Sequence, residues 1–204
     1  MKHTALLLLI PILLLACNQK TSNSASQDQS NENMDTSNTS VIPAAPAPLF
    51  ESKKLHAFSD KAKQDTFILT VDDKGDGDWL KARVNFKIIS HEGKEIYRDT
   101  FDSNFLIDYG ILELADDPAK LTDQMRADYI KKRLQSFFDE KNFRSPAIKP
   151  GAEFEEYHKS KELFDELKQN ENSVSFFYLL GKEDGKYIAY SAKAGKAQLF
   201  YNCC

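Results

Sequence analysis

The chain has 204 residues, of which 41% are hydrophobic and 28% are charged, and its formal net charge is −4 at pH 7. This acidic balance argues against a nucleic-acid-binding protein, which would carry a basic surface. Residues 50–204 are numerous enough to bury one sizeable core.

Residues 1–17 have the pattern of an export signal. Lys2 and His3 precede an apolar run from Ala5 to Ala16, and Cys17 follows it. A cationic start, a short apolar segment and a small residue before the cleavage point are typical of a secretory signal peptide. The run is shorter than the roughly 20 apolar residues of a membrane-spanning helix. We therefore predict that residues 1–16 are a signal peptide.

The end of this segment, Leu14-Leu15-Ala16-Cys17, resembles the lipobox of bacterial lipoproteins, although Leu15 replaces the small residue that is usual there. The resemblance implies that Cys17 becomes the first residue of the mature lipoprotein and carries acyl chains such as palmitate. Several acyl chains anchor a protein stably to a membrane, whereas one chain holds it only marginally. The implied location is the bacterial cell envelope, on the periplasmic side of the outer membrane. The alternative is an ordinary signal peptide beside an unmodified Cys17.

A polar segment of low complexity follows Cys17. Residues 18–40 contain six serines and five asparagines, and such a segment cannot bury enough apolar surface to fold. Residues 41–48 add three prolines among alanines, which favours an extended chain. We predict that residues 17–49 comprise the lipidated cysteine and a disordered tether, and that residues 50–204 form a globular head.

Three predicted strands open the head. They cover residues 66–71, 79–88 and 94–101. Short turns join them, and such short links cannot connect parallel strands, so we expect an antiparallel meander.

The strand predicted at residues 79–88 alternates strictly between apolar and polar side chains, so one face should lie on a core. The predicted core side chains include Leu80, Val84 and Phe86, and the predicted exposed ones are Lys81, Arg83 and Lys87. With Trp79 beside them, these cations could bind an anion or an acidic partner. Long cations are also normal on the wet face of a half-buried strand.

The turn at residues 72–78 is rich in aspartate and glycine and invites comparison with a calcium loop. An EF-hand loop needs an acid at its third position and a glutamate at its twelfth. Counted from Asp72, these positions hold Lys74 and Arg83. We therefore predict a solvated hairpin turn rather than a metal site.

Two helices and three more strands are predicted in the second half of the head. Asp117-Pro118 is a good helix start, and apolar residues recur at helical spacing to about Lys141. A second helix is predicted at residues 160–169, and a start further back, near Glu153, is the alternative. The further strands are predicted at residues 174–180, 186–191 and 196–202.

This order of elements predicts an α+β fold. We expect one antiparallel sheet of about five or six strands, in the order β-β-β-α-α-β-β-β, with both helices packed on one face.

Few residues form a recognisable chemical pattern. His56, His91 and His158 lack the spacing of metal ligands, and we interpret them as surface histidines. Ser191 and Lys193 could suggest a catalytic Ser/Lys dyad, because two residues at this spacing share a face when they lie on one strand. Here they flank a predicted turn, so the pair is weak evidence for catalysis. We predict no catalytic residue, no cofactor and no metal site.

Cys203-Cys204 ends the sequence. Adjacent Cα atoms lie about 3.8 Å apart, below the usual disulfide range that begins near ~4.4 Å, so a bridge between them would be strained and easily reduced. Free thiols are unusual in an oxidising envelope. We therefore expect Cys203 and Cys204 to be oxidised, either to each other or to another chain, and not to be catalytic.

Residues 93–101, 187–191 and 200–204 look like segments of small lipoproteins of Gram-negative bacteria whose domains have no assigned function. The resemblance implies a non-enzymatic envelope protein. The leading hypothesis is a membrane-anchored binding or structural module that engages an envelope protein or other envelope component through its sheet face.

Two other functions are considered. One is an inhibitor of an envelope-attacking hydrolase, similar in plan to the lipoprotein lysozyme inhibitors, and it is suggested by the loop at residues 190–193. A protruding loop around Ser191 and Lys193 would favour it. The other is an enzyme or thiol redox protein centred on Cys203 and Cys204. A pocket with convergent polar groups would favour an enzyme.

Overall fold

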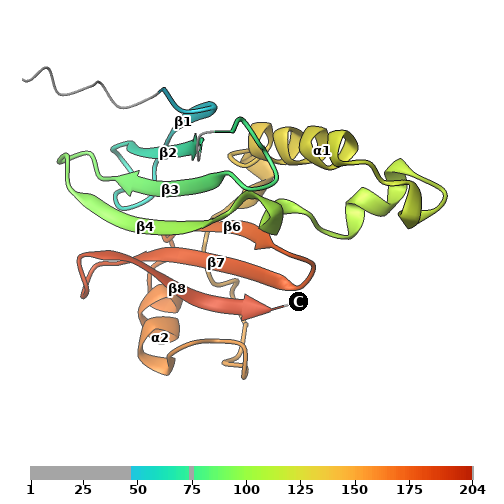
Figure 1. Cartoon of the computed structure of the whole chain (residues 1–204). Coiled ribbons are helices and arrows are strands. Elements are labelled where there is room, and N and C mark those ends of the chain that lie inside the picture. The colour runs from blue at the N-terminus through green and yellow to red at the C-terminus, as the bar shows by residue number, and fades with distance from the viewer. Residues whose placement is uncertain (1–46, 74–75, 204) are drawn as a thin grey trace, which may run out of the picture. The chain divides into compact units, whose positions relative to one another are not determined.

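Two antiparallel sheets packed face to face form the head (Figure 1). The computed structural model describes residues 47–73 and 76–203. The predicted signal peptide, Cys17, the tether before residue 47 and Cys204 lie outside the described residues.

Sheet A contains the first four strands, each antiparallel to the next. They are β1 (Phe50–His56), β2 (Asp65–Asp72), β3 (Arg83–Ile89) and β4 (Glu95–Asp102). This is the predicted meander with one strand added, because β1 pairs with β2 along its whole length. The sequence of β1 has few large apolar residues, so its alternation is hard to recognise.

Sheet B contains the last four strands in the order β5-β6-β7-β8. They are β5 (Phe143–Arg144), β6 (Ser175–Leu180), β7 (Asp184–Ser191) and β8 (Lys196–Cys203). The prediction of a single sheet covered by helices is therefore wrong. Each group of strands presents its own apolar face, and packing the two faces together removes both from water.

Aromatic side chains fill the space between the sheets. Phe67 and Phe86 of sheet A are fully buried, and their ring centroids lie 5.4 and 5.5 Å from that of Phe176 in sheet B. Such edge-on and tilted contacts are the geometry that aromatic pairs prefer. The two sheets are thus held together mainly by apolar burial.

The alternation predicted for residues 79–88 is confirmed within β3. Val84 and Phe86 are fully buried and Arg83 is exposed. Two positions differ from the prediction. Leu80 is half-buried because it precedes the strand in a turn, and Lys87 is half-buried because it stands between Ile68 and Arg98 in the sheet.

α1 (Asp123–Gln135) begins later than predicted. Asp117 does act as a cap, but the turn it caps is the 3-10 helix η3 (Pro118–Lys120). The α-helix itself starts after Thr122, whose side chain accepts a hydrogen bond from the backbone of the first turn. A good cap therefore marked a short turn and not the long helix that follows.

α2 (Lys161–Gln169) agrees with the prediction, and Ser160 caps it. Its side chains Leu163, Phe164 and Leu167 pack on the outer face of sheet B. In contrast, α1 buries Ile130 and Leu134 in the core between the sheets. The two helices therefore do not share one face, which corrects the predicted arrangement.

The remaining helical turns are short 3-10 helices. They are η1 (Ser103–Leu106), η2 (Tyr109–Leu114) and η4 (Glu140–Asn142). Within residues 47–73 and 76–203, no helix has both the length and the apolar character needed to cross a membrane.

A polar network joins β4 to sheet B. The hydroxyl of Tyr178 and the ammonium of Lys186 donate to Asp99 over 2.7 and 2.9 Å. Burial alone would raise the pKa of Asp99, but the hydrogen bonds from Tyr178 and Lys186 outweigh it and hold that pKa below its usual value. The Tyr97 hydroxyl lies 2.6 Å from that of Tyr178. Burial, aided by the negative charge of Asp99, raises the pKa of Tyr97 to about 12.

Candidate functional site

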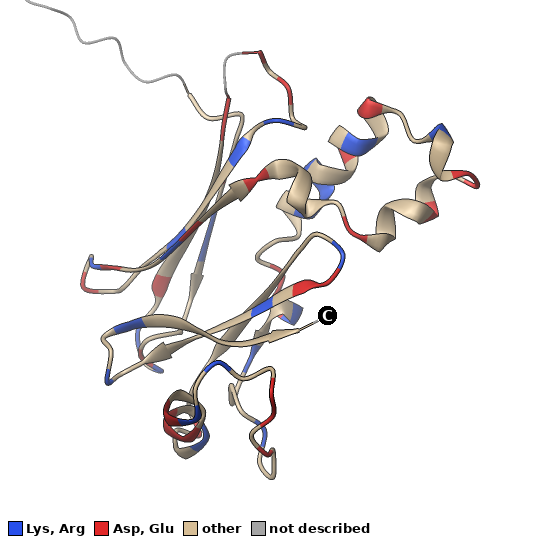
Figure 2. Cartoon of the chain, turned by 60° about the horizontal axis from the view of Figure 1, so that its bottom comes forward, with Lys and Arg blue, Asp and Glu red and all other residues tan. Residues whose placement is uncertain are grey.

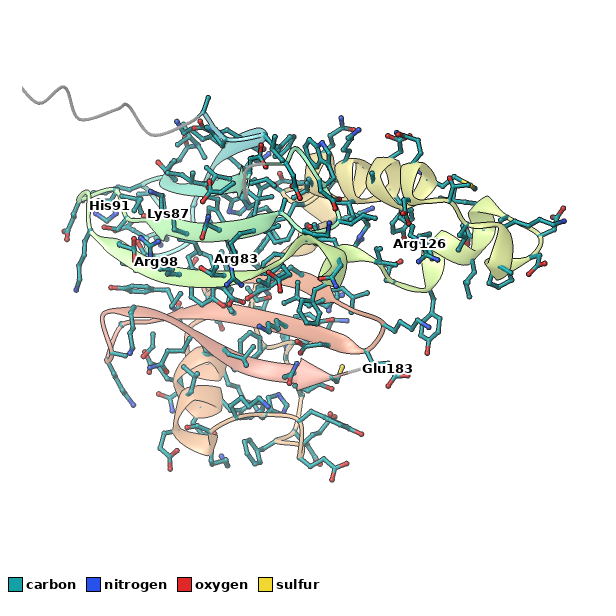
Figure 3. All side chains as sticks on the ribbon, viewed as in Figure 1. Arg83, Lys87, His91, Arg98, Arg126 and Glu183 are labelled. Carbon is teal, nitrogen blue, oxygen red and sulfur yellow. The ribbon has the colours of Figure 1, made fainter. Side chains whose placement is uncertain are left out.

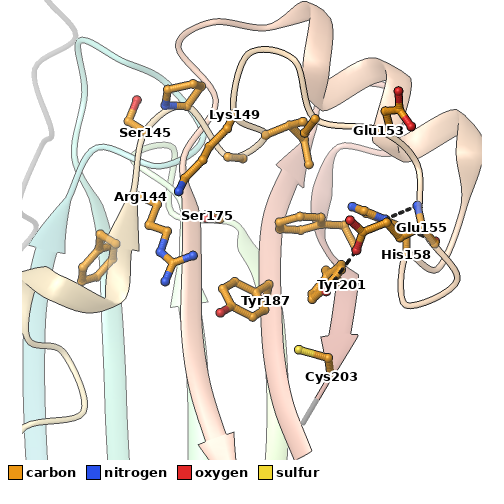
Figure 4. A pocket seen from close by; sticks show the side chains of 16 residues that line it. Arg144, Ser145, Lys149, Glu153, Glu155, His158, Ser175, Tyr187, Tyr201 and Cys203 are labelled. Atoms are coloured by element: carbon orange, nitrogen blue, oxygen red, sulfur yellow. Dashed lines mark hydrogen bonds between the residues drawn. The ribbon is translucent and has the colours of Figure 1, made fainter.

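A large cavity lies on the outer face of sheet B (Figure 4). It measures about 700 Å³ and is covered by the segment 145–158, which connects β5 to α2. A volume of this size is typical of small-molecule binding pockets, which span about 300–1,000 Å³. We take this pocket as the candidate functional site.

Backbone hydrogen bonds fix the covering segment at both ends. Near β6, Ala147 N–H donates to the carbonyl of Ser173 over 3.0 Å. Near β8, Lys159 N–H donates to Phe200 over 2.9 Å, and Asn202 N–H donates to Tyr157 over 3.1 Å. The pocket therefore has anchored walls and is not simply a gap beneath a loose loop.

Aromatic side chains and one serine line the inner wall of the pocket. Tyr187, Phe200 and Tyr201 come from β7 and β8. Ser175 of β6 is only 1% exposed, and its hydroxyl makes no hydrogen bond to any other described residue. In register, Ser175 pairs with Arg144 and Ala189 on the outer face of sheet B. The wall is thus mostly apolar, with one hydroxyl that makes no hydrogen bond to another described residue.

The ionisable side chains that line the pocket are segregated. Arg144 and Lys149 lie at one end, whereas Glu155 and His158 lie at the other (Figure 4). The guanidinium of Arg144 lies 5.3 Å from the ring centroid of Tyr187, within the range of a cation–π contact. The pocket therefore has a cationic end and an acidic end with aromatic surface between them.

The acidic end is held by its own hydrogen bonds. His158 Nδ1 accepts from the backbone N–H of Glu155 over 2.9 Å. The Tyr201 hydroxyl lies 3.5 Å from Glu155 Oε2. Since these groups are engaged with one another, the acidic end is preorganised before any ligand enters.

Of the two terminal cysteines, the structure describes only Cys203. It is a free, half-buried thiol that lines the same pocket. Cys204 lies outside the described residues. The disulfide between Cys203 and Cys204 therefore stays a prediction.

The loop suggested for hydrolase inhibition is tied to α2. Ser191 is 2% exposed, and its hydroxyl donates to Glu166 over 2.8 Å. The backbone N–H of Lys193 donates to the same carboxylate over 3.2 Å. Ser191 therefore links β7 to α2 and does not present its hydroxyl on a protruding loop, so the loop gives the inhibitor hypothesis no support.

The three histidines of the head lie at different places. His56 stacks on Phe143 with ring centroids 3.9 Å apart, whereas His91 Nδ1 lies 3.5 Å from the buried Asp65, and His158 lines the pocket. Across residues 47–73 and 76–203, no three His, Cys, Asp or Glu side chains gather in the manner of metal ligands.

The acidic turn after β2 hydrogen-bonds to its own backbone where it is described. Asp73 accepts from the N–H groups of Asp76 and Gly77, and Asp78 accepts from the N–H of Leu80. These contacts are the local side-chain bonds expected in an aspartate-rich turn. Residues 74–75 lie outside the described part.

The predicted basic stripe is only partly retained on the outer face of sheet A. Lys81 is in the turn before β3 and pairs with Asp78 over 2.7 Å. Arg83 pairs with Asp102 over 3.3 Å, and Lys87 of β3 lies beside its register partner Arg98 of β4 (Figure 3). Cations and acids are interspersed over the head (Figure 2). This face is therefore of mixed charge, and neither helix packs on it.

A second surface feature is the segment between β4 and α1, which extends away from the sheets (Figure 1). Four of its large apolar side chains are between 42% and 52% exposed, namely Phe105, Tyr109, Leu112 and Leu114. Lys182 lies 5.0 Å over the ring of Tyr109. An exposed apolar group of this kind often marks an interaction surface.

Sequence reasoning missed the pocket. The segment from Phe143 to Gly151 lies between the two predicted helices and carries no recognisable motif. The usable signal was Ile148, an isolated apolar residue beside the cation Lys149, because Ile148 is buried against α2.

Comparison of the chain with protein-family models, with curated proteins and with solved structures found no match.

Proposed function

We propose that the protein is a lipid-anchored lipoprotein of the bacterial envelope whose head is a non-enzymatic binding module. In this proposal, Cys17 carries the acyl chains and residues 18–49 form the tether. The head then stands off the membrane, on the periplasmic side of the outer membrane, and the pocket on sheet B is its binding site.

The observation that carries the binding role is the construction of the pocket. A cavity of about 700 Å³ is lined by Tyr187, Phe200 and Tyr201, and its charged groups stand at opposite ends. Pockets that bind small molecules combine mostly apolar walls with a few placed polar groups. The pocket is also built on the strands of a sheet, which hold its inner wall in place.

Binding of a neutral apolar dye tests this proposal. The mature chain with Cys17→Ser, which needs no detergent, is titrated with N-phenylnaphthylamine while its fluorescence is followed. We expect the dye to bind and Ala152→Trp, which fills the pocket, to abolish binding. Ala152 lines the pocket and is half-buried.

The matched control is Ala192→Trp, which adds the same ring at an exposed turn outside the pocket. This variant should bind the dye as the parent chain does. If the parent chain binds no dye, or if both tryptophan variants bind it equally, the pocket is not the binding site.

A further inference from the structure

The cationic end of the pocket is short of anionic partners. Neither Arg144 nor Lys149 forms an ion pair with a carboxylate of the described residues, although both side chains are exposed and line the pocket. Figure 4 shows both side chains reaching toward the same end of the inner wall. By contrast, Glu155 at the other end is engaged by Tyr201.

The buried hydroxyl of Ser175 adds a second, independent observation. Ser175 is 1% exposed, lines the pocket and makes no hydrogen bond to a described residue. A hydroxyl that has no protein partner can donate a hydrogen bond to a bound ligand. Since Ser175 pairs with Arg144 in the sheet, such a ligand group would lie at the cationic end.

The aromatic surface determines what the rest of a ligand must be. Tyr187 lies beneath the Arg144 guanidinium at 5.3 Å, and Phe200 and Tyr201 continue the wall toward the acidic end. A flat apolar body can lie against these rings while its charged group remains beside the cations.

We propose that the pocket binds a small amphipathic organic anion, with its carboxylate or phosphate-type group between Arg144 and Lys149. Ser175 donates a hydrogen bond to that group, and the apolar body lies on Tyr187 and Tyr201. The acids at the opposite end repel the anionic group and so fix the orientation of the ligand. This inference rests on the proposed function, because it names the ligand class of the same site.

Two dyes that differ in one charged group test the proposal. Anilinonaphthalene sulfonate carries an anion on the apolar body that N-phenylnaphthylamine presents without charge. Both are titrated against the mature chain with Cys17→Ser, and the melting curve of every variant establishes that it is folded. We expect the anionic dye to bind about tenfold more tightly than the neutral one.

Two double variants separate local contacts from overall charge. Arg144→Gln with Lys149→Gln should lower the affinity for the anionic dye about tenfold and change the affinity for the neutral dye by no more than about twofold. Lys53→Gln with Lys87→Gln removes the same charge from the outer face of sheet A and should change neither dye by more than about twofold. Ser175→Ala should weaken only the anionic dye, by about fivefold.

The outcomes distinguish this inference from the proposed function. If both dyes bind the parent chain equally, or both double variants weaken the anionic dye alike, the anion site is overturned while the pocket remains a binding site. If neither dye binds the parent chain, the proposed function itself fails.

Discussion

The hydroxyl of Tyr178 in β6 lies 2.7 Å from Oδ2 of Asp99 in β4, so a strand of sheet B is hydrogen-bonded to the edge strand of sheet A. Lys186 in β7 donates to the same oxygen. The Asp99 side chain is only 22% exposed, and such a partly buried charge is tolerated because it accepts these charge-assisted hydrogen bonds. Apolar packing is not directional and does not by itself fix the alignment of two sheets. The hydrogen bond between Tyr178 and Asp99 is directional and therefore fixes their alignment.

Removal of the Tyr178 hydroxyl should weaken the contact between the sheets. Tyr178→Phe should lower the free energy of unfolding by about 1.5–3 kcal/mol, the range for a hydrogen bond to a charged group. Urea unfolding measures this loss. Tyr190→Phe is the control, because the half-buried Tyr190 makes no side-chain hydrogen bond to a described residue, and it should change stability by no more than about 0.5 kcal/mol. Equal losses would contradict the proposed role of Tyr178.

The raised pKa of Tyr97 predicts a loss of stability in alkali. The pKa of this hydroxyl rises from 10.0 to about 12 in the fold, chiefly through burial. The folded chain therefore holds a proton that the unfolded chain releases. The stabilisation of the fold by the protonated Tyr97 hydroxyl is complete below about pH 10 and is lost as the pH rises from about 10 through about 12.

Melting curves recorded across this pH range, with tyrosinate absorbance measured in parallel, test the prediction. Tyr97→Phe should reduce the alkaline loss of stability. It should not abolish it, because burial, aided by Asp108, also raises the pKa of Tyr129 to about 12. An unchanged alkaline slope in the variant would show that Tyr97 does not contribute.

Truncation of a side chain should cost much more stability on the inner face of β3 than on its outer face. Phe86 is fully buried among aromatic rings of both sheets, so Phe86→Ala should destabilise the head by about 3–5 kcal/mol. Lys87→Ala on the outer face should change the free energy of unfolding by no more than about 0.5 kcal/mol. A larger loss from Lys87→Ala would reverse the assignment of the two faces.

The local pattern of the strands could be predicted from the sequence, whereas their division into two sheets could not. Alternation in residues 82–88 indicates which side of β3 is buried, but it does not indicate which element packs on that side. A helix or a second sheet would satisfy the same pattern. Here Phe176 and Tyr178 of β6 pack on the buried side of β3. They lie far from β3 in the sequence, and alternation within β3 carries no information on such distant partners.

The two helices show the same limit in another form. α2 begins at Lys161, one residue from the predicted start, and Ser160 caps it. The prediction holds because the apolar residues of the helix follow at once. Asp117 caps only the short turn η3, and the backbone becomes extended at Leu121 before α1 begins.

The candidate pocket could not be predicted from the sequence for a related reason. Its walls come from segments 143–158 and 175–203, and no local motif joins Ser175 to Arg144.

The lipid anchor makes a separate prediction. Cys17→Ser should abolish acyl labelling and release the protein from membranes into the soluble fraction, since the predicted anchor is the acylated cysteine. Fractionation of cells that express the variant and the parent chain measures this. Unchanged retention in membranes would contradict lipidation at Cys17, whatever the head binds.

The central claim is that the pocket on sheet B is the binding site of the head. Amide chemical shifts of the mature chain with Cys17→Ser, recorded during titration with anilinonaphthalene sulfonate, test it most directly. We expect the largest chemical-shift changes at Ser175, Tyr187 and Tyr201, and we expect all of them to saturate with the same dissociation constant. Shifts confined to the exposed segment 105–114 or to the outer face of sheet A, with the pocket resonances unmoved, would contradict it.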